Sequence, residues 1–364
     1  MPEYNARNER IKRDYFALLA EADQRSQQTI DGVRKAISRY EQFTEFADFA
    51  AFNKDMAVGF KRHLQAANAV RTGKPLSPAT IRSTLYAVQE FFRWLAREPG
   101  YRTKIRPDDI RYLNLPRKDL AAAQSPRTRK VPTIEQVRAA LAAMPTATEV
   151  ERRDRALIAF TLLTGMRDGA IASLKLKHID LDQCLVIQDP KEIKTKFSKR
   201  IETFFFRVGD DIERIVTDWI RHLREEQLYG HDDPVFPRTR VAPNDDMHFE
   251  ATGLEPVCWS SAGPIRRIFQ GAFAAAGLPY FSPHSFRSTL TILGEQICRT
   301  PEDFKAWSQN LGHESPLTTF NSYGKVAIHR QGQLVRNAGK QDPQDEKLDR
   351  IASMIENLHA RKTS

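Results

Sequence analysis

The chain has 364 residues but little cysteine and no long hydrophobic run that is free of charge. Its three cysteines, Cys184, Cys258 and Cys298, stand too far apart to favour a disulfide framework or a structural zinc cluster. No uncharged run approaches the roughly 18 residues needed to cross a bilayer, and the charged N-terminus lacks the apolar segment of a secretory signal. We therefore expect a cytoplasmic protein with no metal ion, no cofactor and no membrane partner.

Positive charge, in contrast, is in excess. Lysine and arginine total 56 and aspartate and glutamate 46, which gives a formal net charge of +10 at pH 7. A chain of this length favours two domains over one or three and can bury an ample core. The excess of positive charge favours an acidic partner, and nucleic acid is the first candidate.

The sequence of the first hundred residues predicts a series of helices. Hydrophobic patterning places three of them at about residues 8–22, 29–43 and 55–67, and a fourth begins at Pro78 with Ser77 as its N-cap. In the fourth helix the apolar residues recur in steps of four and three, so they share one helical face. These residues are Ile81, Leu85, Val88, Phe92 and Leu95. The N-terminal part is therefore predicted to be a helical domain.

A basic stretch follows at residues 101–131, and its last part is small, polar and interrupted by proline, as in an interdomain linker. We place a helical domain at residues 1–116, a basic linker at 117–132, a second domain at 133–338, and a tether with an amphipathic helix at 339–364. That last helix could dock on its own domain or on a neighbouring molecule. The linker is either a solubilising hinge or a segment that follows a phosphate backbone. In the second case its DNA-binding residues are Arg117, Lys118, Arg127, Arg129 and Lys130.

The sequence of the second domain predicts a mainly α-helical fold with a small β-hairpin, which belongs to the α+β class. Thr133 and Gln136 form a capping box at the start of its first helix, and a strongly apolar helix covers residues 156–163. Two strand-like segments, 184–188 and 201–208, flank a basic turn, which indicates a hairpin. Further helices are predicted at residues 210–227, 264–276, 284–298 and 301–310.

Five places in the second domain hold side chains suited to a phosphate. Taken singly, each has an ordinary explanation: an exposed loop arginine, a solvated hairpin tip, a helix-capping histidine, a glycine-flanked histidine after a helix, or a half-buried tyrosine. Taken together, two arginines, two histidines, a lysine and a tyrosine are typical of phosphoryl transfer with a hydroxyl nucleophile and no metal ligand. The set comprises Arg167, the hairpin-turn residues Lys191, Lys194, Lys196, Lys199 and Arg200, His284 with Arg287, His313, and Tyr323.

Four segments that carry these residues resemble the catalytic domain of the tyrosine recombinase (phage integrase) family. They are TGMRDGAIASLKLKHIDL, IKTKFSKRIETFFF, PHSFRSTL and LGHESPLTTFNSYG, and they stand in the family's order. The resemblance covers about residues 131–330. The helical N-terminal region is similar to the family's core-binding domain. The implied architecture is a helical core-binding domain followed by a tyrosine recombinase catalytic domain.

The resemblance also implies which residues bind the scissile phosphate. Arg167 and Arg287 would hold its non-bridging oxygens. His284 would hydrogen-bond and exchange a proton near the nucleophile, and His313 would hydrogen-bond the phosphate.

The same resemblance implies a general acid and a nucleophile. The hairpin lysine would protonate the departing 5′ oxygen; Lys194 is the better match and Lys196 the alternative. Tyr323 would attack phosphorus and form a 3′-phosphotyrosyl link. Other basic residues of the turn, Lys196, Lys199 and Arg200, are expected to contact DNA.

Two features depart from the family's pattern. The family usually has an acidic residue three positions after the first arginine, where this chain has Ala170. Asp168 is the candidate substitute. The spacing between His313 and Tyr323 is also one residue longer than usual.

The expected function is site-specific recombination by a tetramer on two paired sites in double-stranded DNA, as in the integration or excision of a mobile element. An accessory DNA-bending protein is a candidate partner, and the expected location is cytoplasmic, at the nucleoid. Two alternatives stay open: strand relaxation of the type IB topoisomerase kind, and a non-catalytic DNA-binding protein on the same fold.

Overall fold

The computed structural model describes residues 4–70, 73–124, 130–193, 199–243 and 248–313, and the chain divides into two compact units, Met1–Ser125 and Pro126–Ser364. The division falls inside the segment expected to be a linker. The first half of that segment is a helix, Arg117–Gln124, instead of an irregular chain. The leucine and the three alanines of this segment, residues 120–123, have high helix propensity, which explains why it is helical.

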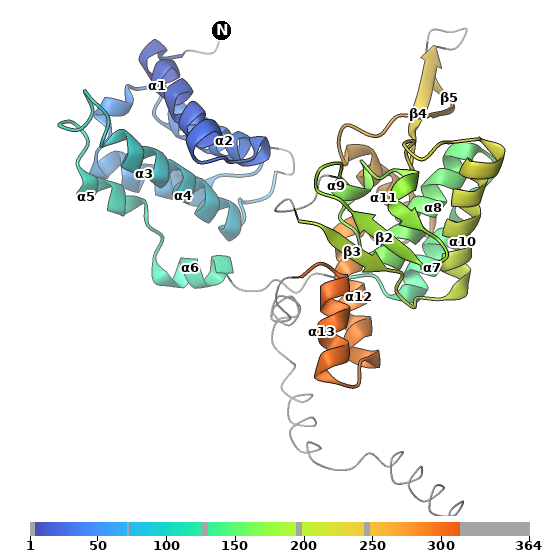
Figure 1. The fold of residues 1–364 in the computed structure, drawn as a ribbon. Helices are drawn as coiled ribbons and strands as arrows, with labels where there is room; N and C mark the ends of the chain where they lie inside the picture. The colour runs from blue at the N-terminus through green and yellow to red at the C-terminus, as the bar shows by residue number, and fades with distance from the viewer. Residues whose placement is uncertain (1–3, 71–72, 125–129, 194–198, 244–247, 314–364) are drawn as a thin grey trace, which may run out of the picture. The chain divides into compact units, whose positions relative to one another are not determined.

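The elements described in the first unit are all helices, joined by loops and turns (Figure 1). Ser77 caps its longest helix as predicted, because its hydroxyl accepts a hydrogen bond from the Thr80 amide at 3.2 Å. All the apolar residues predicted to share one face of that helix are buried. The elements are α1 (Ala6–Ala17), η1 (Leu18–Ala22), α2 (Gln27–Phe43), η2 (Phe49–Ala51), α3 (Lys54–Ala66), α4 (Pro78–Leu95), α5 (Pro107–Ile110), η3 (Arg111–Leu113) and α6 (Arg117–Gln124).

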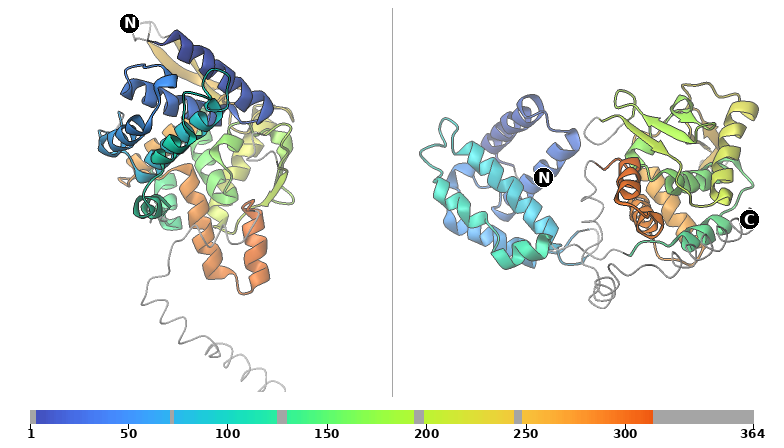
Figure 2. Two further views of the ribbon diagram at one scale, coloured as in Figure 1. Left: turned by 90° about the vertical axis from the view of Figure 1, so that its left-hand side faces the viewer. Right: turned by 60° about the horizontal axis from the view of Figure 1, so that its bottom comes forward.

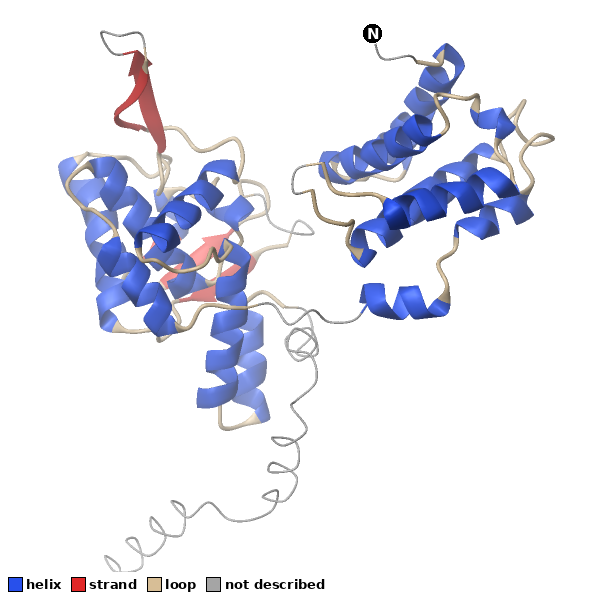
Figure 3. Cartoon of the chain, turned by 180° about the vertical axis from the view of Figure 1, so that it is seen from behind, coloured by secondary structure: helices blue, strands red, loops and turns tan. Residues whose placement is uncertain are grey.

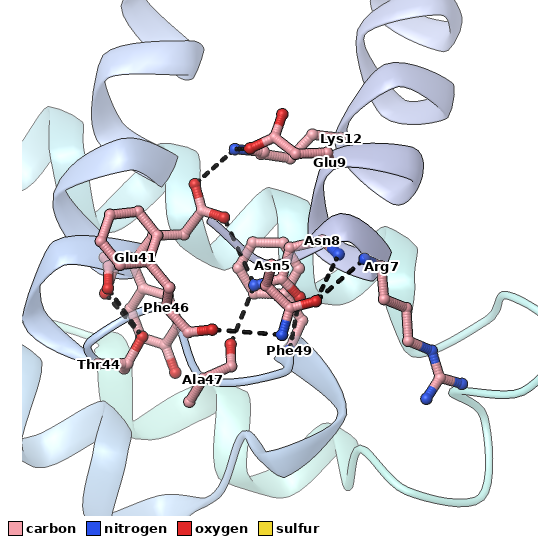
Figure 4. A network of polar contacts seen from close by, with 11 residues as sticks. Asn5, Arg7, Asn8, Glu9, Lys12, Glu41, Thr44, Phe46, Ala47 and Phe49 are labelled. Atoms are coloured by element: carbon pink, nitrogen blue, oxygen red, sulfur yellow. Dashed lines mark hydrogen bonds and ion pairs between the residues drawn. The ribbon is translucent and has the colours of Figure 1, made fainter. Parts of the chain in front are cut away.

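A buried polar network ties α1 to α2 and to the loop that follows α2 (Figure 4). The Glu41 carboxylate, which is only 1% exposed, lies 2.6 Å from Nζ of Lys12 and accepts from Nδ2 of Asn8 at 3.4 Å. The same amide of Asn8 donates to the Ala47 carbonyl at 3.0 Å. Burial raises the pKa of Glu41, and the ammonium of Lys12 opposes that effect. The network therefore keeps a buried carboxylate hydrogen-bonded where two helices meet.

The second unit surrounds one hydrophobic core with helices and carries two small antiparallel sheets (Figure 3). Its first helix begins with the predicted capping box: Gln136 N donates to Thr133 Oγ1 at 3.2 Å, and Thr133 N donates to Gln136 Oε1 at 3.0 Å. The elements are α7 (Ile134–Ala143), α8 (Glu149–Thr164), α9 (Asp168–Ile171), η4 (Leu176–His178), β1 (Ile179–Asp180), β2 (Leu185–Gln188), β3 (Ile201–Phe204), α10 (Asp210–Arg221), η6 (His222–Glu226), β4 (Arg238–Pro243), β5 (Phe249–Glu255), α11 (Gly263–Ala275), α12 (Pro283–Ile297) and α13 (Pro301–Asn310).

The predicted hairpin is present as β2 and β3, which pair antiparallel from Leu185 opposite Phe204 to Gln188 opposite Ile201. Strand β1 adds a third, short member to the sheet. The second strand is shorter than the sequence predicted and ends at Phe204. The chain turns away there because the Phe206 amide donates to the Leu163 carbonyl of α8 at 2.8 Å, which draws Phe206 into the core.

A second hairpin, β4–β5, was not predicted, and it projects from the unit (Figure 1). Most of its residues are exposed on both faces, so its sequence lacks the alternation of apolar and polar residues that marks a half-buried strand. Its base is held by Arg153 of α8, whose buried guanidinium donates to the Pro237 carbonyl at 2.6 Å and to Thr239 Oγ1 at 3.1 Å. Among the described residues, no helix is long and apolar enough to cross a membrane.

Candidate active site

The site begins where α8 ends at a glycine. Gly165 has φ +59° and ψ 18°, a left-handed conformation that closes the helix, and its amide donates to the Thr161 carbonyl at 2.9 Å. A Cβ atom on Gly165 would lie 2.8 Å from the side-chain ends of both Leu290 and Leu311. Glycine is therefore required twice, by the backbone and by the packing. Arg167 follows two residues later and serves as the N-cap residue of α9.

Arg287 joins the ends of two other helices to its own. It lies in α12 and is 5% exposed. Its Nη1 donates to the Gly165 carbonyl at 2.6 Å, and its Nη2 donates to the carbonyl of Leu311, the C-cap residue of α13. The Gly165 carbonyl thus lies two residues before Arg167, and the Leu311 carbonyl lies two residues before His313. Arg287 thereby fixes the backbone that carries both side chains.

Helices α12 and α13 pack side by side (Figure 2). Trp307 of α13 donates from its indole to the Leu290 carbonyl of α12 at 2.8 Å, and a Cβ atom on Gly294 would collide with the same indole at 2.5 Å. After α13, Gly312 takes a positive φ of +68°, and the His313 amide donates back to the Ser308 carbonyl at 3.1 Å. This tight exit turns the chain so that His313 lies near the arginines.

Four of the predicted catalytic side chains come together here: Arg167, His284, Arg287 and His313. Burial, followed by the charges of Arg287, Arg167 and His284 in that order, lowers the pKa of His313 to about 4. His313 is therefore a neutral imidazole at pH 7, able to donate or accept a hydrogen bond. His284 is exposed in the first turn of α12.

The site concentrates positive charge. Burial lowers the pKa of Arg167, and burial followed by the charge of Arg167 lowers that of Arg287 to about 9. Among the described residues, no carboxylate lies within ion-pair distance of either guanidinium. Two partly desolvated cations with no counter-charge in the described part of the chain make an environment that an anion would stabilise.

Asp168, the candidate substitute for the missing acidic residue, has another partner. Its Oδ2 accepts from Nε of Arg266 in α11 at 2.8 Å, and its Oδ1 accepts from the Gly169 amide at 2.9 Å. Ala170, at the position usually acidic in the family, is buried. The sequence offered no signal for the partnership with Arg266, because the two residues are 98 positions apart.

The hairpin that leads to the candidate lysines is attached to α13. Asn310 bonds Phe204 of β3 twice: its Oδ1 accepts from the Phe204 amide at 2.7 Å and its Nδ2 donates to the Phe204 carbonyl at 2.9 Å. Thr203 Oγ1 donates to the Asn310 carbonyl at 3.2 Å. Sequence reasoning missed Asn310, since an asparagine at a helix end usually satisfies its own helix.

The other side of the hairpin is anchored as well. Glu192 lies between Lys177, at 2.8 Å, and the ring of the buried His178, at 3.1 Å. The next residue, Ile193, is buried. The hydrogen bonds of Lys177 and then His178 hold the pKa of Glu192 below its usual range. The chain is therefore held in place on both sides of the basic turn, by Glu192 before it and by Asn310 after it.

Several predicted residues lie outside the described part of the chain: Lys194, Lys196 and Tyr323 of the site, and Arg127 and Arg129 of the linker. The amphipathic helix predicted within residues 339–364 lies outside it too.

The remaining candidates for DNA contact, Arg117, Lys118, Lys130, Lys199 and Arg200, are all exposed. Arg117 and Lys118 begin helix α6. Arg200 forms an ion pair with Glu202 at 3.0 Å. Over the described residues, no group of three or more His, Cys, Asp or Glu side chains is placed to hold a metal ion.

The model of the phage integrase family matches residues 130–330. The chain belongs to this family. It is 23% identical over 263 residues to the tyrosine recombinase XerC of Lactobacillus delbrueckii subsp. bulgaricus, a match that covers 71% of this chain and 75% of the relative. The family predicted from the four motifs is thereby confirmed, and with it a site-specific DNA recombinase.

Solved structures show the same fold at low sequence identity. A lambda integrase fragment, described as a dimer bound to a COC′ core site, superposes with a TM-score of 0.60 at 17% identity, covering 88% of this chain and 99% of that one. The integrase of transposon Tn1549, in complex with transposon right end DNA, gives a TM-score of 0.58 at 15% identity, with 90% and 99% covered. The predicted fold class is confirmed.

Proposed function

We propose that this recombinase integrates or excises a mobile element by cutting and rejoining double-stranded DNA through a 3′-phosphotyrosyl link to Tyr323. The observation that carries the proposal is the pair Arg167 and Arg287, two partly desolvated guanidiniums without a carboxylate partner among the described residues, beside the neutral imidazole of His313. Such a pair suits the non-bridging oxygens of a phosphodiester.

In this mechanism the two arginines replace the charge that a metal ion supplies in other phosphoryl-transfer sites. Arg287 already donates one N–H from each terminal nitrogen to a carbonyl, and the other described residues leave three of its five N–H groups for the phosphate. His313 donates a hydrogen bond to the phosphate, and His284 exchanges a proton near the nucleophile.

The covalent step is a balanced exchange of esters. The Tyr323 hydroxyl gives its proton to His284 and its oxygen attacks phosphorus. The bond from phosphorus to the 5′ oxygen breaks, and Lys194, or Lys196 in its place, gives that oxygen a proton. The 3′ end is then held as a phosphotyrosine ester. The 5′ hydroxyl of another strand reverses the step, so the energy of the broken bond is conserved and no ATP is needed.

Pairing two sites implies assembly of several protomers on DNA. We propose a tetramer that binds the duplex through the basic residues of the linker and of the hairpin turn. A related structure supports the idea: a lambda integrase tetramer bound to a Holliday junction superposes on this chain with a TM-score of 0.60. The terminal helix would link neighbouring protomers, an accessory protein would bend the DNA, and the protein would act at the nucleoid in the cytoplasm.

The test uses nicked suicide duplexes whose bases around the nick are randomised, because covalent capture then selects its own site. Wild-type protein is expected to form an adduct that survives denaturation, and sequencing the captured DNA gives the target. Tyr323→Phe should form none. The control is Tyr280→Phe, which removes an exposed phenol on which the charges of Arg266 and Asp168 act; its adduct should equal that of wild type.

The outcomes separate the alternatives. An adduct that persists in Tyr323→Phe shows that another residue is the nucleophile. DNA binding without any adduct points to the non-catalytic protein. Supercoil relaxation on the selected site without recombinant product, by a protein that stays monomeric on DNA, points to the topoisomerase-like activity.

A further inference from the structure

The pair of Asp168 and Arg266 lies at the edge of the site and is not explained by the mechanism above. Asp168 directly follows Arg167, and its Oδ2 holds Nε of Arg266 at 2.8 Å. The Arg266 side chain is 61% exposed and that of Asp168 is 24% exposed. An exposed ion pair of this kind contributes only about 0.2–1 kcal/mol to stability, so stability alone is a weak reason for it.

The geometry leaves most of the guanidinium available. Asp168 takes the single N–H of Nε, and the hydrogen bonds of the described residues leave the four N–H groups on the two terminal nitrogens unused. A planar fork of terminal N–H groups matches phosphate oxygens, and a carboxylate that restrains the rest of the side chain lowers the entropy lost on binding.

We propose that Arg266 binds a DNA phosphate next to the scissile one and that Asp168 orients its guanidinium for that contact. The placement follows from the chain: the residue that holds Arg266 is the neighbour of Arg167, and Arg167 is proposed to hold the scissile phosphate. The phosphates of one strand follow one another at about 3.4 Å along the helix axis, so a guanidinium held by the neighbour of Arg167 is a candidate to bind the phosphate next to the scissile one. The inference rests on the proposed function, because it requires DNA as the substrate.

The pair also explains how a carboxylate is tolerated at this position. Without Arg266, the charge of Asp168 would repel a bound DNA strand. Arg266 could therefore act in either of two ways, by neutralising Asp168 or by binding phosphate itself. The double variant Asp168→Asn/Arg266→Gln separates them, since it removes the charge of Asp168 together with the arginine.

The experiment measures the affinity of the full-length protein for a duplex oligonucleotide of arbitrary sequence over a range of salt concentrations, because phosphate contacts do not depend on sequence. Loss of one phosphate contact reduces the slope of log K against log salt by about 0.9. We expect this reduction in both Arg266→Gln and the double variant. Adduct formation at low DNA concentration should fall about tenfold in Arg266→Gln, the size expected for one charge-assisted hydrogen bond.

The matched control is Arg267→Gln, which removes the same charge one position further along α11. Arg267 is exposed and lines a different surface, a cleft with Met144, Glu151 and Asp154. Its slope and adduct rate should equal those of wild type. Melting temperatures of all variants should agree within a few degrees, which shows that each is folded.

The proposal is overturned if Arg266→Gln keeps the wild-type slope, or if the double variant regains it. These results are distinct from a failure of the proposed function, in which wild-type protein forms no covalent adduct. If wild type forms the adduct and Arg266→Gln forms it equally fast with an unchanged slope, the recombinase function stands and only the role of Arg266 is lost.

Discussion

Replacing Gly165 with alanine tests how the site is built. At φ +59° an alanine pays about 1–2 kcal/mol for the left-handed conformation. Its Cβ would also lie 2.8 Å from the side-chain ends of Leu290 and Leu311, and overpacking of a core costs about 1–3 kcal/mol. We expect Gly165→Ala to lose about 2–5 kcal/mol of unfolding free energy in total, of which the packing part is particular to this site.

Gly277→Ala is the matched control. Gly277 has nearly the same backbone angle, φ +66°, but a Cβ atom there meets nothing within 4 Å. Both variants share the backbone strain and the entropy change of the unfolded chain, so the difference between them isolates the packing term of about 1–3 kcal/mol. At roughly 2–4 °C per kcal/mol for a domain of this size, Gly165→Ala should melt several degrees below Gly277→Ala.

The same variants report on the site, because the Gly165 carbonyl accepts from Arg287. A shift of that carbonyl displaces Arg287 from the position that Leu311 also fixes. Adduct formation on a suicide substrate should therefore fall much more in Gly165→Ala than in Gly277→Ala. Equal melting temperatures and equal adduct rates in the two variants would refute the packing argument.

Two further changes test the elements around the site. Asn310→Ala removes both hydrogen bonds to Phe204, so it should cost about 1–2 kcal/mol of stability and slow adduct formation. Asn310→Asp keeps only the acceptor and should give intermediate values. A melting temperature and adduct rate of Asn310→Ala equal to those of wild type would show that α13 does not hold the hairpin. The pKa of His313 is about 4 in the folded protein, below the usual 6.5. As pH falls, the imidazole is therefore protonated in the unfolded chain before it is protonated in the folded protein. The stability of the fold should decline between about pH 6.5 and pH 4 for this reason. His313→Asn should flatten that decline in denaturant titrations, and an unchanged pH profile would mean that His313 is not held in its neutral form.

Local pattern predicted most of the helices because helix signals are short-range. Ser77 with Pro78, and Thr133 with Gln136, lie within one helical turn of the groups they cap. The face of α4 repeats every three or four residues and is buried as predicted. The hairpin β4–β5 was not predicted because most of its residues are exposed on both faces. Its sequence therefore lacks the alternation of apolar and polar residues that predicts a strand.

The sequence alone determined which reactive groups the chain carries, the order in which they occur and hence the family, because these properties belong to short segments. Only the tertiary structure decided how the groups are held. Arg287 binds a carbonyl 122 positions away, Asn310 bonds a strand 106 positions away, and Asp168 is committed to Arg266 instead of Arg167. Contacts over such separations depend on how the helices pack around the core, and no local periodicity records them.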